Sequence, residues 1–107
     1  MVTVYITLKG PMKLQIMGHA NAAEPGKDLV CCALSIIAQS LSMYLYDLEN
    51  AGLLKESINS VMPGNTFIEV VASEYGDQLV RAAFAMARAG LRAMAEDYPE
   101  NISMKEE

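Results

Sequence analysis

The chain begins with two short segments in which apolar and polar residues alternate. Residues 2–8 read VTVYITL and residues 12–17 read MKLQIM. A period of two with β-branched residues is typical of half-buried β-strands. Gly10-Pro11 lies between the segments and is a turn signal. The pattern therefore predicts a β-hairpin at the start of the chain.

Two longer segments show helical spacing instead. From Asp28 to about Asn50, apolar residues recur every three or four positions, which predicts one long helix that ends at Ala51-Gly52. The same spacing from Gly76 to about Glu96 predicts a second helix. Alanines give one side of this second helix only small side chains, which allows close approach to a sheet or to a partner subunit.

The segment between the helices predicts a second hairpin. Residues 53–62 (LLKESINSVM) and 66–72 (TFIEVVA) are the expected strands, and Pro63-Gly64-Asn65 lies between them. The last five residues, SMKEE, are expected to form a polar tail. The order ββαββα predicts one α+β domain over residues 1–107, in which two helices cover one face of a four-stranded, mainly antiparallel sheet. The other sheet face is expected to be partly exposed, which makes a homodimer plausible.

Composition and charge narrow the classes of function. The 107 residues are 52% hydrophobic, enough for a core, and the net charge is −5 with scattered basic residues. We therefore expect no direct nucleic-acid binding through phosphate contacts. No uninterrupted apolar run reaches the roughly 18 residues of a membrane span, and the N-terminus lacks the pattern of a signal peptide. The expectation is a cytoplasmic protein with no membrane partner.

The candidate chemistry lies between residues 18 and 35, which read GHANAAEPGKDLVCCALS. His19 is the only histidine of the chain, and Cys31 and Cys32 are its only cysteines. A disulfide between adjacent cysteines is strained, and a cytosolic chain would keep both as thiols. These three residues give no zinc-ligand pattern, so we expect no metal and no cofactor.

A nucleophile is one interpretation of Cys31. Its position in the first helical turn places it near unpaired N–H groups and the positive end of the helix dipole, which favour an anion. The loop before it is long enough to bring back His19 as a general base, and the N–H groups of the same helix start could hold an oxyanion. The alternative is that Cys31 only packs, that His19 is a loop residue and that Asp28 is an ordinary N-cap.

The same stretch resembles a known family. Gly18-His19-Ala20, followed after a loop by Gly26-Lys27-Asp28-Leu29-Val30-Cys31 and then Ser35, is similar to the motif of the ribosomal-processing cysteine protease family Prp. The VTVYIT start, the ββαββα order and the ending Tyr98-x-Glu100-Asn101-Ile102 also look like that family. The resemblance covers essentially the whole chain. One departure is Cys32, where the family usually has a small residue, often Ala.

The resemblance implies a cysteine endopeptidase that removes a short N-terminal extension from a large-subunit ribosomal protein, and a homodimer. Carried over by position, Cys31 would be the nucleophile and His19 the general base. Gly18, Asp28 and Ser35 match other motif positions. We expect Gly18 to let the chain turn, Asp28 to cap the helix or orient His19, and Ser35 to support the sulfur or line the pocket.

Three other functions remain open at the level of sequence. A relative of the kind encoded by prophages would keep the dyad and process a virion protein. A non-catalytic dimeric module would keep the fold and only bind peptides. A thiol redox protein would need a resolving thiol, for which Cys32 is poorly placed within the same helix.

Overall fold

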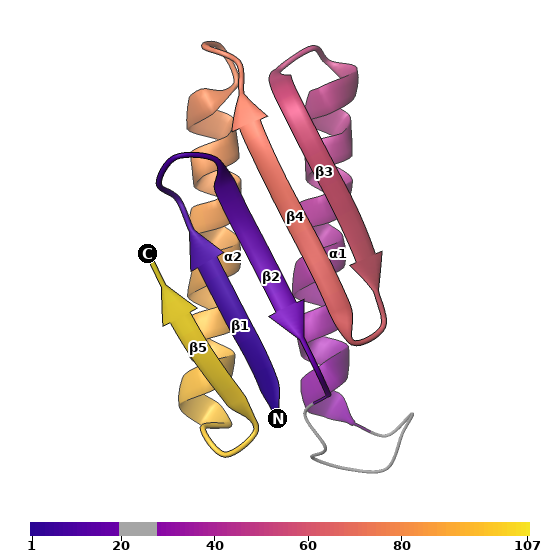
Figure 1. The fold of residues 1–107 in the computed structure, drawn as a ribbon, viewed down its shortest axis with the longest axis vertical. Helices are drawn as coiled ribbons and strands as arrows, with labels where there is room; N and C mark the ends of the chain where they lie inside the picture. Colours follow the sequence, from indigo (N-terminus) through magenta and orange to yellow (C-terminus); the bar gives the residue numbers. More distant parts are fainter. Residues whose placement is uncertain (20–27) are drawn as a thin grey trace.

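The structure is a computed structural model that describes residues 1–19 and 28–107. The predicted loop with Pro25, and the motif residues Ala20, Gly26 and Lys27, lie outside the described residues. Both predicted hairpins and both predicted helices are confirmed (Figure 1). The elements are β1 (Val2–Thr7), β2 (Met12–Met17), α1 (Leu29–Asn50), β3 (Leu54–Met62), β4 (Asn65–Ala72), α2 (Asp77–Asp97) and β5 (Ile102–Glu106).

The strands form one sheet in the order β3-β4-β2-β1-β5, and both helices lie on the same face of it (Figure 1). The two hairpins join through an antiparallel pairing of β2 with β4, in which Met17 pairs with Asn65. This pairing brings the end of β2 beside the turn that connects β3 to β4. The predicted α+β two-layer architecture is therefore confirmed, and the pairing determines what lies next to the segment after Met17.

The sheet has five strands, not the four expected from the sequence. The segment predicted as a polar tail forms β5, which pairs in parallel with β1 and makes the sheet mixed. Ile102 is buried, whereas most of the residues after it are exposed. The strand forms because the edge of β1 supplies hydrogen-bonding partners and because Arg92 of α2 donates a hydrogen bond of 2.7 Å to Glu106.

The core lies between the sheet and the helices. Phe84 and Leu91 of α2 and Leu45 of α1 are fully buried against strand residues such as Ile6 and Leu14. By length and composition alone, α1 could cross a membrane. In the fold, its apolar stripe instead packs in the core. The three- and four-residue spacing of these apolar positions places them on the side of α1 that faces the sheet. The stripe consists of Val30, Leu34, Ala38, Leu41, Leu45 and Leu48.

Candidate active site

The start of α1 is fixed by Asp28. Its carboxylate Oδ1 accepts hydrogen bonds from the backbone N–H groups of Val30, at 3.0 Å, and of Cys31, at 3.1 Å. Asp28 is the N-cap of the helix and is itself buried. This is the usual way in which a short acidic side chain satisfies the orphan donors of a first turn. The cap places Cys31 in that turn with a half-buried side chain.

The capping pattern bears on the expected oxyanion site at the start of α1. The N–H of Cys32 also donates to Asp28, to its carbonyl oxygen at 3.1 Å. The donors of Val30, Cys31 and Cys32 are therefore all engaged by the capping residue. An oxyanion needs donors directed at it, and these three are directed at Asp28 here, so the oxyanion expectation stays a prediction.

The segment that carries His19 follows directly from the end of β2. Gly18 has a φ of +96°, and a Cβ built on it would lie 2.7 Å from the carbonyl oxygen of Met1. Both features require glycine at this position. The N–H of Gly18 donates to the carbonyl oxygen of Gly64 at 2.9 Å, which ties the segment to the β3–β4 turn. The expected turn at Gly18 is therefore present immediately before His19.

The sequence-predicted residues meet around one small pocket of about 200 Å³. Gly18 and His19 line it from the end of β2, and Cys31 and Ser35 line it from α1. Ser35 lies one helical turn after Cys31, so both face the same side of the helix. Asp28 takes part through its hydrogen bond to the backbone of Cys31. Cys32 is exposed and is not among the residues that line the pocket.

Sequence reasoning missed one side of this pocket. The end of the β3–β4 hairpin, residues 61–66, contributes a wall, and Gln39 extends the α1 wall one turn beyond Ser35. The hairpin reaches the site because β4 pairs with β2, a contact that no local pattern indicates. Gln39 could have been found, since Cys31, Ser35 and Gln39 recur every four residues along one face of the helix.

The pocket combines a thiol in a first helical turn with the only imidazole of the chain. Within residues 1–19 and 28–107, no group of three or more His, Cys, Asp or Glu side chains is placed to hold a metal ion. A thiol and an imidazole in one pocket are the side chains that thiol-dependent hydrolases use for nucleophilic catalysis. The fold and the pocket thus indicate the class of protein, which is an α+β domain with the side chains of a thiol-dependent hydrolase in one pocket.

Comparison with known proteins supplies the family. The family model described as Cysteine protease Prp matches residues 1–103, and the chain belongs to this cysteine protease family. The resemblance carried by Gly18, His19, Asp28, Cys31 and Ser35 is therefore confirmed at the level of the family. No curated protein matches the chain.

Solved structures share the fold. The essential ribosomal processing protease Prp from S. aureus, in complex with a covalently linked product peptide, is similar with a TM-score of 0.76 at 21% identity, over 100% of both chains. The same protease in complex with a substrate peptide gives a TM-score of 0.72 at 21% identity, over 100% of both chains. SMU.848 from Streptococcus mutans gives 0.65 at 23% identity, over 98% of this chain and 90% of its own.

Proposed function

We propose that this protein is an endopeptidase that removes an N-terminal extension from a ribosomal protein, with Cys31 as nucleophile and His19 as general base. The observation that carries the proposal is that both side chains line one pocket in a chain of the cysteine protease Prp family. The substrate class is taken from the similar S. aureus protein, which is a ribosomal processing protease.

The mechanism follows from the two groups. The imidazole of His19 accepts the thiol proton as the sulfur of Cys31 attacks the scissile carbonyl carbon. The imidazolium then donates this proton to the leaving amine, and a thioester remains on Cys31. Water, activated by the now neutral His19, cleaves the thioester and releases the new carboxylate. Ser35 lines the same pocket as Cys31 and is proposed to support its sulfur.

The walls of the pocket favour an apolar peptide segment. Leu34 of α1 and Val61, Met62 and Pro63 of the β3–β4 hairpin contribute apolar surface, and Met62 is 62% exposed. Gln39 and Asn65 add polar side chains that can hydrogen-bond to a peptide backbone. A cleft that combines apolar walls with polar groups is typical of a ligand-binding site. A similar S. aureus protein is known in complex with a substrate peptide.

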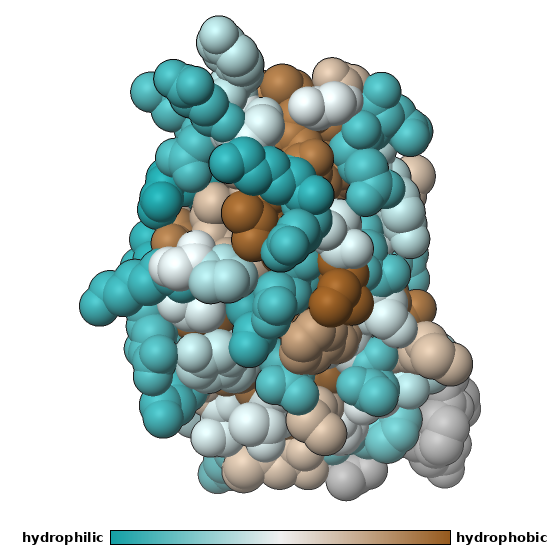
Figure 2. Space-filling model, turned by 45° about the horizontal axis from the view of Figure 1, so that its top comes forward, coloured by the Kyte–Doolittle hydropathy of each residue, from teal (hydrophilic) through white to brown (hydrophobic). Residues whose placement is uncertain are grey.

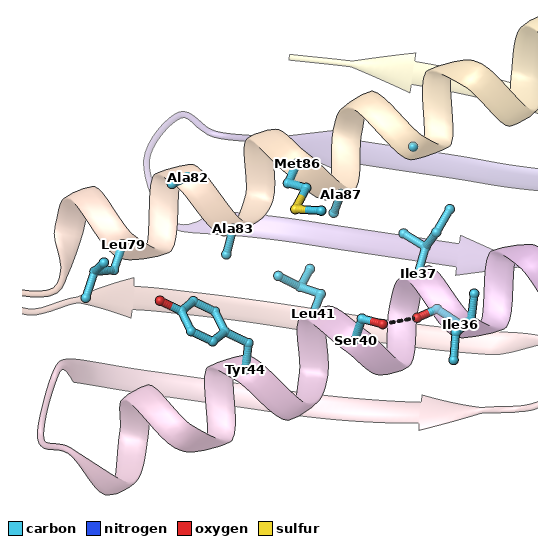
Figure 3. A pocket seen from close by; sticks show the side chains of 11 residues that line it. Ile36, Ile37, Ser40, Leu41, Tyr44, Leu79, Ala82, Ala83, Met86 and Ala87 are labelled. Atoms are coloured by element: carbon cyan, nitrogen blue, oxygen red, sulfur yellow. Dashed lines mark hydrogen bonds between the residues drawn. The ribbon is translucent and has the colours of Figure 1, made fainter.

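We further propose that the protein is a homodimer joined through its helical layer. A groove of about 500 Å³ runs between α1 and α2, and Tyr44, Leu79 and Met86 line it (Figure 3). Ile36 and Met86, on its two sides, are 60% and 80% exposed. Two chains that each carry a charge of −5 repel one another, so an uncharged apolar face is where they can meet.

The sheet is a poorer candidate for this contact, although the sequence suggested it. Figure 2, tilted by 45° from the view of Figure 1, shows many hydrophilic side chains on this side of the molecule, with separate smaller hydrophobic patches between them. Lys13 of β2 forms an ion pair of 3.3 Å with Glu69 of β4 there, and its ammonium lies 5.7 Å from the ring centre of Phe67. We therefore place the proposed interface on the helices. We also propose a cytoplasmic location, where the free thiols of Cys31 and Cys32 stay reduced and ribosomal proteins are made.

A cleavage assay tests the function. The substrate is the purified ribosomal protein with its N-terminal extension from the same organism, and the products are identified by mass spectrometry. We expect cleavage by the wild type and by Cys32→Ala, and none by Cys31→Ala or His19→Ala. Cys32→Ala is the matched control because it removes the neighbouring thiol and leaves the pocket residues in place.

Other outcomes separate the alternative functions. Cleavage of a virion protein but not of the ribosomal protein would identify a relative of the prophage type. No cleavage by any variant, together with an unreactive Cys31, would contradict the protease function and leave a peptide-binding module. Cleavage by Cys31→Ala would contradict the assignment of the nucleophile.

A further inference from the structure

The β3–β4 turn lies in direct contact with the His19 imidazole. A Cβ built on Gly64 would lie 2.8 Å from Nε2, 3.0 Å from Cε1 and 3.6 Å from Cδ2 of His19. Carbon atoms in van der Waals contact are normally about 3.5 Å or more apart. The imidazole ring therefore already fills the space that a Cβ on Gly64 would need. The edge of the imidazole that carries Nε2 therefore packs against the bare backbone of Gly64.

The position of this turn is fixed by the sheet. Met62 pairs with Asn65, so Pro63 and Gly64 are the two residues of the turn. Proline requires a negative φ at the first position, and Gly64 has a φ of +72° at the second, which is the arrangement of a type II turn. The carbonyl oxygen of Gly64 accepts the N–H of Gly18 at 2.9 Å. Backbone and ring of the His19 segment thus both contact the same glycine.

We infer that Gly64 is a positioning residue for His19. Its missing side chain leaves the space in which the imidazole lies, and the turn limits where the ring can lie within the pocket that it shares with Cys31. The inference rests on the proposed function, in which His19 is the general base. A general base acts only when it is held within hydrogen-bonding reach of the proton that it removes.

Glycine at this turn has a second explanation, namely the positive φ alone. Gly10 separates the two explanations. It has a φ of +62° in the turn between β1 and β2, at the other end of β2 from His19, and a Cβ built on it meets nothing within 4 Å. Gly10→Ala therefore introduces the backbone strain of a positive φ without a side-chain clash. Gly64→Ala introduces both.

The experiment compares these two variants in the peptide-cleavage assay and by NMR. We expect Gly64→Ala to lower kcat by about tenfold or more relative to Gly10→Ala, with little change in KM, because small displacements of a catalytic group are costly. Because His19 is the only histidine, its ring resonances are unambiguous in a selectively labelled protein. We expect them to shift in Gly64→Ala and to stay unchanged in Gly10→Ala.

Gly64→Asn provides a second variant if the alanine variant folds poorly, because asparagine accepts a positive φ more readily yet still brings a Cβ to the ring. Wild-type ring resonances and a kcat within about twofold of Gly10→Ala in a folded Gly64 variant would overturn the inference. So would unfolding of both Gly64 variants while Gly10→Ala folds, since Gly64 would then be structural. If His19→Ala still cleaves, the proposed function fails instead, and the NMR comparison still reports whether Gly64 sets the ring.

Discussion

The carboxylate of Asp28 accepts a hydrogen bond of 3.1 Å from the backbone N–H of Cys31. The residue that caps the helix is therefore hydrogen-bonded to the backbone of the proposed nucleophile. The same oxygen also accepts the N–H of Val30. An anionic cap both satisfies these donors and places a negative charge near the sulfur. Two functions of Asp28, capping the helix and assisting the site, can therefore be separated by removing the charge and keeping the cap.

We predict that Asp28→Ala lowers the free energy of unfolding by about 1 kcal/mol, because the first turn loses its cap. Asp28→Asn keeps an oxygen acceptor and should be close to the wild type in stability. Urea unfolding of the three proteins measures both effects. If Asp28→Asn is as stable as the wild type but loses most of its cleavage activity, the carboxylate also orients His19. A loss of stability in Asp28→Asn equal to that in Asp28→Ala would contradict the capping role.

The two adjacent thiols offer a test of reactivity within one peptide. Cys32 is exposed and Cys31 is half-buried, so exposure alone predicts faster alkylation of Cys32. The proposed dyad predicts the reverse, because a thiolate is the reactive form and His19 lines the pocket of Cys31. We expect limiting iodoacetamide at pH 7 to modify Cys31 first, and this preference to disappear in His19→Ala. Tandem mass spectrometry assigns the modified sulfur, and preferential labelling of Cys32 in the wild type would contradict the prediction.

The sequence predicted the elements whose patterns are local. The two helices and two hairpins follow from periods of three to four and of two, and the capping of α1 follows from Asp28 before an apolar run. His19 and Cys31 could be proposed as a dyad because the chain has one histidine and two cysteines. Ser35 could be proposed because it lies one helical turn after Cys31. The family resemblance then selected among the alternatives.

The features that were missed depend on contacts between distant parts of the chain. β5 carries few buried residues of its own and becomes a strand because β1 offers a free edge, with Val2 paired to Ile102. The contact of Gly64 with His19 depends on β4 pairing with β2, with Met17 opposite Asn65. Neither pairing leaves a periodic signal in the sequence, since both are decided by how the hairpins assemble.

The ion pairs of β5 give a pH-dependent prediction. Arg92 Nε donates a hydrogen bond of 2.7 Å to Oε1 of Glu106, and Arg92 Nη2 lies 2.6 Å from the same oxygen. The hydrogen bond from Arg92 holds the pKa of Glu106 below its usual range. A carboxyl group whose pKa is lower in the folded state stabilises the fold above the unfolded-state value of about 4.5, and this contribution is lost as the pH falls through the lower folded value.

We therefore predict that Glu106→Gln lowers Tm slightly at pH 7 and has no effect at a pH below the folded pKa of Glu106. The change should be small, because both side chains are partly exposed and water screens the pair. Glu100→Gln, in the turn before β5, controls for the loss of one negative charge. Thermal unfolding followed by circular dichroism at the two pH values provides the measurement. An equal change in Tm at both values would show that Glu106 acts through packing and not through its charge.

The proposed helical interface is tested by placing a charge in the groove between α1 and α2. Met86 is 80% exposed on α2, so Met86→Lys should fold normally. In a dimer it would place one lysine from each chain in the apolar interface, where an unpaired charge is costly. We expect sedimentation to give twice the 11.6 kDa chain mass for the wild type and a single chain mass for the variant. Ile58→Lys is the matched control, because Ile58 is a 54% exposed apolar residue on β3, away from the helices. A wild-type monomer would contradict the dimer, and dissociation by Ile58→Lys with a dimeric Met86→Lys would move the interface to the sheet.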